Sequence, residues 1–201
     1  IKNQSQQQLL MGVILEDVTR LDRLITDISQ ASRVEAELAQ THRDNVDFRA
    51  LLDSWVSMMS DRYPDVKLSW NQDDENQDKA NFQVSIHTGR IIQILDNLLA
   101  NAISFNPPDK EIEIELEIIG KNKICFSIRD HGSGIPEANL DTIFKRFYTQ
   151  RPDNEAFGHH SGLGLSIARQ IAEAHGGDLY AGHTPENGAI LFLELPLAKQ
   201  A

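Results

Sequence analysis

Three side-chain amides recur every four residues in the stretch QILDNLLANAISF, residues 93–105. Gln93, Asn97 and Asn101 therefore share one face of a helix, because residues four apart are neighbours on the helix surface. Amide oxygens suit a hard cation such as Mg²⁺, which usually shares its coordination shell with substrate phosphates, and amide nitrogens can donate to phosphate oxygens. A single buried Asn more often bridges neighbouring backbone groups. The stripe of three amides indicates the polar wall of a ligand site.

A second candidate, DHGSGIP (residues 130–136), follows a stretch that alternates like a strand. Asp130 can accept a hydrogen bond from an exocyclic amine, such as that of adenine. Gly132 and Gly134 permit backbone conformations closed to other residues and the close approach of a flat ligand. By itself, Asp-X-Gly after a strand is also an ordinary turn.

A third candidate, SGLGLSIARQ (residues 161–170), places two glycines at the start of a helical pattern. The free N–H groups and the dipole of a helix start favour an anion such as a phosphate. The chain contains no G-x-x-x-x-G-K-[S/T] motif and no strand-linked G-x-G-x-x-G, so neither a Walker-type loop nor a dinucleotide fingerprint is present. Either glycine pair alone is equally consistent with chain punctuation.

Two further groups of polar residues resemble metal ligands but are better interpreted otherwise. The glutamates of EIEIELEII are spread along one face of a predicted strand, which favours a solvated outer face; they are Glu111, Glu113, Glu115 and Glu117. His159 and His160 have no Cys and no close carboxylate pair beside them, so we expect loop histidines.

The amino-acid composition limits the class of protein that can position these groups. The chain has 201 residues, 40% of them hydrophobic and 24% charged, which is typical of a soluble globular protein. Its net charge of −11 disfavours nucleic-acid binding, and its single cysteine, Cys125, excludes an internal disulfide and fits a reducing compartment. No apolar run approaches the roughly 20 residues of a membrane span. The sequence does not begin with Met, and we expect upstream segments outside it.

Residues 9–38 predict a long amphipathic helix with a coiled-coil-like seam, because apolar residues recur every seven positions at Ile14, Leu21 and Ile28. Such a narrow helix needs a partner to bury its stripe. Packing on its own globular domain is one possibility; a helical bundle or dimer seam is favoured by the persistent spacing. Residues 41–47 read as a short polar linker.

Beyond residue 45, helices and strands mix without strict βαβ alternation, which predicts an α/β sandwich with a mixed, mostly antiparallel sheet. Helices are expected over residues 48–63, 88–105 with Thr88 as N-cap, a short one around 139–148, and 162–177. Strands are expected over residues 66–70, 82–87, 111–119, 124–130, 178–182 and 189–195.

The order of the motifs is more specific than any one of them. QILDNLLANA, DHGSGIP, IFKRFY and SGLGLSIA resemble, in series, the N box, first G box, F box and second G box of the ATP-binding domain of two-component sensor histidine kinases. That domain has the Bergerat-type ATPase fold, and the resemblance assigns residues 45–201 to it. Residues 1–41 resemble the second helix of the family's dimerisation and phosphotransfer hairpin, without its acceptor helix.

The resemblance implies a role for each motif. Asn101 would hold Mg²⁺, and Asn97 would contact the phosphates and be the catalytic residue, with Gln93 a weak second catalytic candidate. Phe105 would stack on adenine, and Asp130 would bind its amine. The remaining nucleotide-binding residues would be Gly132, Gly134, Ile135, Tyr148, Arg151, Gly162, Leu163, Gly164 and Leu165. Phe144 and Phe147 would pack in the F box, and residues 149–160 would form the ATP lid.

Some positions depart from the family pattern. Ser104 and Thr149 stand where basic residues are common, and Arg151 is a substitute for the second of these. The family's phosphoacceptor histidine is followed by an acidic residue and then Pro, a context found at none of the seven histidines: His42, His87, His131, His159, His160, His175 and His183.

The resemblance therefore implies a kinase core that binds Mg-ATP and phosphorylates a histidine outside this chain. The phosphoryl group would pass to an aspartate in the receiver domain of a response regulator. The intact protein would be a homodimer through the helical hairpin, on the cytoplasmic side of a bacterial inner membrane to which upstream segments attach it.

Two alternatives remain open. The missing acceptor and the replaced basic residues are compatible with a pseudokinase that senses ATP without turnover. Hydrolases of the gyrase, chaperone and mismatch-repair group instead place a Glu on the amide helix to activate water. Here Gln93 is a poor base, and Asp96 lies about 100° around the helix from Asn97.

Overall fold

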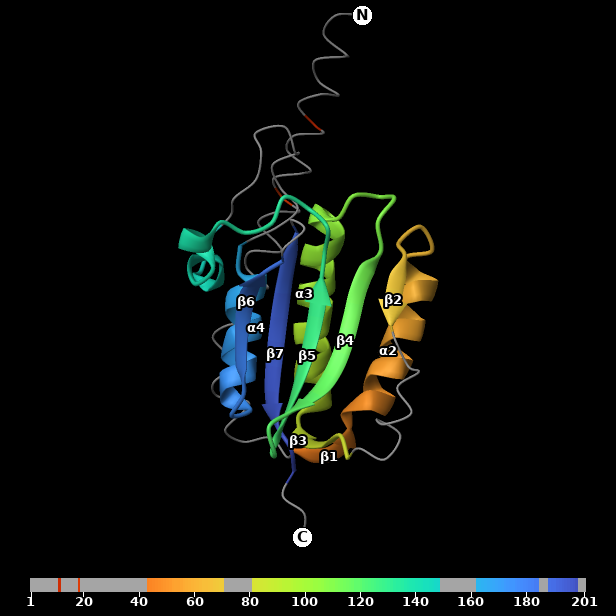
Figure 1. The fold of residues 1–201 in the computed structure, drawn as a ribbon, viewed down its shortest axis with the longest axis vertical. Helices are drawn as coiled ribbons and strands as arrows, with labels where there is room; N and C mark the ends of the chain where they lie inside the picture. The colour runs from red at the N-terminus through yellow and green to blue at the C-terminus, as the bar shows by residue number, and fades with distance from the viewer. Residues whose placement is uncertain are drawn as a thin grey trace, which may run out of the picture.

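The computed structural model describes residues 43–70, 81–148, 162–184 and 188–198, together with Met11 and Val18. In these residues a five-stranded sheet forms one layer, and helices pack on one of its faces (Figure 1). The strands in spatial order are β2 (Leu68–Trp70), β4 (Ile112–Ile119), β5 (Lys123–Arg129), β7 (Ala189–Pro196) and β6 (Asp178–His183). β2 runs parallel to β4, and the other three pairs are antiparallel. The predicted mixed, mostly antiparallel sheet is confirmed.

The helical layer consists, over the described residues, of α2 (Phe48–Arg62), α3 (Thr88–Phe105) and α4 (Gly164–Ala174), with α3 between the other two (Figure 1). The buried residues of α3 are spaced three and four apart and form one continuous apolar face. They are Ile91, Ile94, Leu95, Leu98, Leu99 and Ala102. Because this face belongs to the core, the polar amides of the same helix lie beside it rather than within it.

The central strands alternate as a sheet covered on one face requires. In β4, Ile112, Ile114 and Leu116 are buried in the core that the helices share. Glu113, Glu115 and Glu117 lie on the opposite face of the same strand, half-buried or exposed. The glutamates of EIEIELEII thus lie on the outer face of the sheet, as the sequence predicted.

Three local predictions are wrong. Residues 44–47 are not a linker but strand β1 (Asp44–Asp47), which pairs with β3 (Gln83–Ile86), since Val46 packs against the core. The N-cap of α3 is His87, whose carbonyl accepts the first helical N–H groups, so Thr88 is the first helical residue. The short helix expected over residues 139–148 is replaced by two 3₁₀ turns, Glu137–Asn139 and Thr142–Phe144.

Two predicted segments lie outside the described residues. They are the lid, residues 149–160, and the long helix over residues 9–38, of which Met11 and Val18 alone are described. Both of these residues are helical and exposed. No helix within the described ranges has the length and apolar character that crossing a membrane requires.

His175 joins the end of α4 to the start of α3. Its Nδ1 lies 2.7 Å from the carbonyl oxygen of Ile171, and its Nε2 accepts the backbone N–H of His87 at 3.0 Å. Both contacts together require a neutral ring with its proton on Nδ1. Burial holds the pKa of His175 below its ordinary value of 6.5, and the charge of Arg43 acts in the same direction. Protonation of the ring would remove the acceptor that His87 uses.

We therefore expect the free energy of unfolding to fall as the pH drops below about 6.5. The unfolded chain binds a proton at His175 in that range while the folded chain resists it, so folding is less favourable at lower pH. The expected loss is on the order of 1 kcal/mol between pH 7.5 and pH 5.5. Denaturant unfolding of the parent and of His175→Gln measures it. Equal pH dependence in both proteins contradicts the prediction.

Candidate functional site

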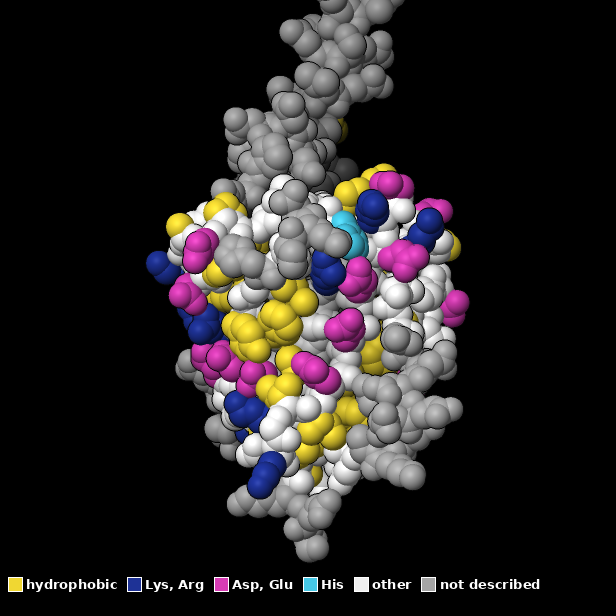
Figure 2. All heavy atoms as spheres, in the orientation of Figure 1, with side chains coloured by type: hydrophobic (Ala, Val, Ile, Leu, Met, Phe, Trp, Pro, Cys, Tyr) yellow, Lys and Arg dark blue, Asp and Glu magenta, His cyan; other side chains and the backbone are white. Residues whose placement is uncertain are grey.

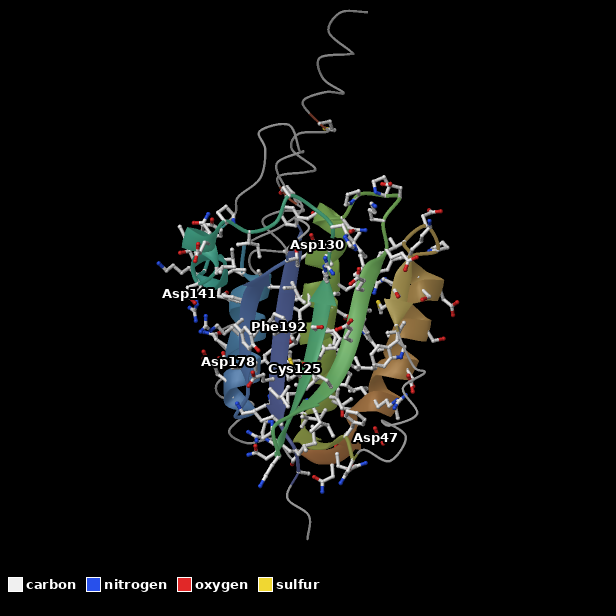
Figure 3. The ribbon with its side chains drawn as sticks, viewed as in Figure 1. Asp47, Cys125, Asp130, Asp141, Asp178 and Phe192 are labelled. Atoms are coloured by element: carbon white, nitrogen blue, oxygen red, sulfur yellow. The ribbon has the colours of Figure 1, made fainter. Side chains whose placement is uncertain are left out.

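The sequence motifs meet at one end of the sandwich, where α3 and β5 end and α4 begins (Figure 1). Figure 3 labels Asp130 at this end of β5, next to the end of α3, whereas Asp47 lies at the opposite end of the molecule. The strand and helix directions bring these termini together, since β5 and α3 run toward this end and α4 runs away from it. Three segments distant in the sequence thus share one edge of the fold.

The amide helix contacts the second glycine motif directly. The Asn97 side-chain nitrogen donates to the carbonyl oxygen of Gly164 at 3.2 Å, and a Cβ on Gly164 would lie 3.2 Å from the Asn97 amide oxygen. Asn101, one turn further along, donates its side-chain nitrogen to the Asn97 carbonyl at 2.9 Å. This bond leaves the amide oxygen of Asn101 as the end of the side chain that can coordinate a cation.

Gln93 does not join this arrangement. Its side-chain oxygen accepts from the guanidinium of Arg90 at 2.9 Å, in the first turns of α3. Eight residues separate it from Asn101, which corresponds to about 12 Å along the helix axis. Gln93 therefore shares the amide face but lies away from the end of the sandwich where the other motifs meet.

Asp130 is a buried carboxylate with one oxygen engaged. The residue is 6% exposed, and Oδ1 accepts the N–H groups of Gly132 at 2.9 Å and Ala189 at 3.2 Å. The second oxygen makes no hydrogen bond within the described residues, so it can accept from a ligand. Burial raises the pKa of this carboxyl, and the two N–H donors partly offset the effect. The two bonds also fix the direction in which the free oxygen points.

The glycines around Asp130 allow backbone segments to approach one another. A Cβ on Gly132 would lie 2.5 Å from the Phe105 carbonyl oxygen, so the loop touches the end of α3. Gly134 has a φ of +78°, and a Cβ there would lie 2.9 Å from the carbonyl oxygen of Gly188. From the sequence, these glycines were expected to allow the close approach of a flat ligand. In the structure they also allow the close approach of the protein's own backbone. Ile135 packs against the core from this loop.

The start of α4 presents backbone rather than side chains. Leu163 is 1% exposed, and Leu165 packs against the core, so their side chains are turned inward. No side chain of the N-cap residue closes the first turn of α4. Gly162, with a φ of +70°, accepts the Phe147 N–H at 3.0 Å through its carbonyl oxygen. This geometry suits an anion held by N–H groups at the helix start.

The aromatic residues divide into two groups. Phe105 is 40% exposed at the end of α3, and Phe147 is 60% exposed. Phe144 is buried, with the Arg169 guanidinium 5.1 Å from its ring centroid, and Tyr148 is half-buried beside Gly162. Thr149 and Arg151 lie outside the described residues.

Sequence reasoning missed three residues that shape the site. Asn106 accepts the His131 N–H through Oδ1 at 2.9 Å and donates to the carbonyls of Pro107 and Lys110. A Cβ on Gly188 would meet the Asp130 carbonyl oxygen at 2.1 Å, so only glycine fits there. Two of them have a recognisable turn signal in the sequence: Asn106 precedes Pro107, and Gly188 follows an Asn just before β7. Ala189 contributes through its backbone, for which no side-chain signal exists.

Together these features define a nucleotide-binding α/β domain. A buried carboxylate with a directed free oxygen suits an exocyclic base amine, and the paired amides beside the start of α4 suit phosphates and their cation. Residues 87–199 match the family described as histidine kinase-, DNA gyrase B- and HSP90-like ATPase. The chain belongs to this family.

The relatives and similar structures are sensor kinases. The sensor protein ChvG of Rhizobium meliloti (strain 1021) is 43% identical over 205 residues, 97% of this chain and 35% of the relative. The chain thus spans about a third of the length of the curated relatives it matches. The nucleotide-free catalytic domain of histidine kinase ThkA is 27% identical with a TM-score of 0.64, covering 78% of this chain and 98% of that domain.

Two larger structures show the same fold. Full-length ShkA in complex with AMPPNP has a TM-score of 0.72 at 24% identity, covering 98% of this chain and 40% of that one. ThkA in complex with the response regulator protein TrrA has a TM-score of 0.70 at 24% identity, covering 93% and 50%. The predicted Bergerat-type ATP-binding domain of the sensor histidine kinases is confirmed.

Proposed function

We propose that this chain is the catalytic core of a two-component sensor histidine kinase that transfers the γ-phosphoryl group of Mg-ATP to a histidine outside this sequence. The observation that carries the proposal is the Asp130 carboxylate, whose free oxygen lies at the end of the sandwich where Asn97, Asn101 and the start of α4 also meet. The same end of the sandwich therefore has a group that can bind the adenine base and groups that can bind the phosphates.

Each group has a defined part in the proposed reaction. Asp130 accepts the adenine amine, and the exposed ring of Phe105 stacks on the base. Asn97 and the N–H groups of residues 162–165 hold the phosphates. Asn101 fits Mg²⁺ because its amide oxygen is free to coordinate; when bound, the ion neutralises phosphate charge. Phosphoryl transfer depends mainly on such positioning and charge stabilisation.

The contacts of Asp96 favour phosphotransfer over ATP hydrolysis. Its Oδ1 accepts the indole N–H of Trp55 at 2.9 Å, which ties α3 to α2 on the side away from α4. Gln93 is bonded to Arg90. Neither residue is placed to activate water at the phosphates, whereas the hydrolase alternative requires a general base on this helix.

The partners follow from the same proposal. The acceptor histidine lies on a helix that completes the hairpin of residues 1–41, and two such hairpins form the homodimer. The phosphoryl group then passes to an aspartate of a response-regulator receiver domain. Segments beyond this sequence attach the protein to the bacterial inner membrane, with this chain on the cytoplasmic side.

Two measurements distinguish the proposed kinase from its alternatives. Calorimetry of the 201-residue chain with Mg-ATP should give saturable binding, and absence of binding refutes the proposal. The longer protein that carries the acceptor should incorporate label from γ-labelled ATP into an acid-labile phosphohistidine. Binding without transfer identifies a pseudokinase, and steady phosphate release without protein labelling identifies a hydrolase.

Asn106 provides a further test of the site. Replacing it with Ala should weaken ATP binding about tenfold, because the partly buried His131 N–H loses its partner, at a cost near the lower end of about 1–3 kcal/mol, and the loop carrying Asp130 loses its tie to α3. Asn106→Asp retains the acceptor for the His131 N–H and should bind ATP more tightly than the Ala variant. Calorimetric titration of both proteins gives the comparison, and equal affinities would contradict this role of the side-chain oxygen.

A further inference from the structure

The helices α2, α3 and α4 lie on one face of the five-stranded sheet, and no α-helix of residues 43–198 that the structure describes covers the opposite face (Figure 1). Strand register identifies the side chains on this outer face. Beside Glu113, Glu115 and Glu117 of β4, it carries alternate residues of β5, β7 and β6. Those that set the chemistry of the face are Lys123, Cys125, Arg129, Phe192, Glu194 and Tyr180.

The centre of the outer face carries an aromatic pair. The rings of Tyr180 and Phe192 stack with centroids 5.1 Å apart, and Cys125 and Ser127 on the adjacent strand are 4% and 7% exposed. Burial raises the pKa of the Cys125 thiol to about 11, so this residue stays neutral. Figure 2 shows hydrophobic side chains gathered over this part of the face, where Figure 3 labels Phe192 and Cys125. Two stacked aromatic rings depart from the polar residues that are usual on a solvated sheet face.

The charges around this centre are predominantly acidic after internal pairing. Glu194 is bonded to Lys123 at 2.7 Å and to the Tyr180 hydroxyl at 3.0 Å. Glu113 pairs with Arg129 and His131. Glu115 and Glu117 are exposed and have no ion-pair partner within the described ranges. Asp178 is also exposed, at the edge of the face. The uncompensated charge on this face is therefore negative.

The aromatic pair and the negative charge together determine which kinds of partner can bind the outer face. A second copy docked through the same face would oppose carboxylates with carboxylates, which is unfavourable in a two-fold interface. Anionic lipid surfaces and nucleic acids are repelled for the same reason. Five strands about 4.8 Å apart and up to eight residues long give a face of roughly 20 by 25 Å. That area corresponds to the smaller, transient signalling interfaces.

We infer that the outer face of the sheet is a docking surface for a partner protein that presents aromatic or aliphatic side chains flanked by Lys and Arg. The apolar groups of the partner cover Tyr180 and Phe192, and its cations meet Glu115 and Glu117. The surface is the face opposite the helical layer, so the inference does not depend on the proposed kinase reaction.

A defined peptide probe tests the surface. A fluorescent 12-residue peptide alternating Lys or Arg with Leu or Trp is titrated into the 201-residue chain, with anisotropy as the readout. The double variant Glu115→Lys/Glu117→Lys should bind the peptide at least about tenfold more weakly. The matched control, Asp61→Lys/Asp65→Lys, makes the same change in net charge at exposed positions at the end of α2 and should bind like the parent.

The outcomes separate a specific surface from general charge attraction. A version of the peptide with Glu in place of Lys and Arg should not bind. Phe192→Ser should also weaken binding, and thermal unfolding establishes whether that variant is folded. The inference is overturned if the parent does not bind the basic peptide, or if both double variants lose affinity equally.

Discussion

Replacing Asn101 with Ala is expected to lower phosphohistidine formation by the longer, acceptor-containing protein at least about 100-fold. Groups that merely support a metal ligand are typically worth 10–100-fold, and a direct ligand should exceed that range. The reason lies in the geometry of α3. The side-chain nitrogen of Asn101 is held by the Asn97 carbonyl at 2.9 Å, which presents the oxygen as a ready-oriented ligand. Rates with γ-labelled ATP at saturating Mg²⁺ provide the measurement.

The specific signature of this role is magnesium dependence. In the parent, ATP affinity should increase on addition of Mg²⁺, whereas in Asn101→Ala the two affinities should be nearly equal. Asn101→Asp keeps an oxygen ligand and should retain part of the magnesium effect. Asn45→Ala is the matched control, since Asn45 is an exposed residue of β1 at the opposite end of the molecule (Figure 1). A magnesium effect of parental size in the Ala variant would refute the assignment.

The second large effect concerns base specificity. Asp130→Asn should weaken ATP binding about 100-fold, equivalent to roughly 2.7 kcal/mol. The amide oxygen can still accept from Gly132 and Ala189, so the loop keeps its conformation. The amide nitrogen then occupies the place of the free oxygen and presents a donor to the donor amine of adenine.

The same substitution should favour a base with a carbonyl oxygen at that position. Inosine triphosphate carries this acceptor, so its affinity relative to ATP should rise in Asp130→Asn. Competition between the two nucleotides in a calorimetric titration measures the ratio, and unfolding curves verify the fold. If the variant prefers ATP over inosine triphosphate as strongly as the parent does, Asp130 does not read the base amine.

Features of the fold that depend on residues close together in the sequence were predictable from the sequence. The sheet composition follows from alternating runs such as EIEIELEII, because side chains on a strand alternate between two faces. The apolar face of α3 follows from three- and four-residue spacing. The four ordered motifs identified the ATP-binding domain, since glycines, amides and Asp130 are restricted by residue type and order.

Patterns whose cause is a distant contact were not predictable. Residues 44–47 look like a polar linker because their pairing partner, β3, is about 40 residues away and contributes backbone hydrogen bonds rather than a sequence signal. Thr88 has the residue type of an N-cap, yet the chain enters α3 through His87, whose N–H is taken by His175 from the end of α4. Local propensity was overridden by a contact spanning 88 positions.

The sequence by itself determined which chemical groups this protein has for a nucleotide: two amides one turn apart, a carboxylate after a strand and glycines at a helix start. Only the tertiary structure decided which of them act together. It separates Gln93 from Asn101 along the helix, directs one oxygen of Asp130 away from its backbone partners, and adds Asn106, Gly188 and Ala189 through contacts that residue type alone does not reveal. The physical reason is that spacing fixes only relations within one helix or strand. The meeting of α3, β5, β7 and α4 is set by burial of their apolar faces in a shared core.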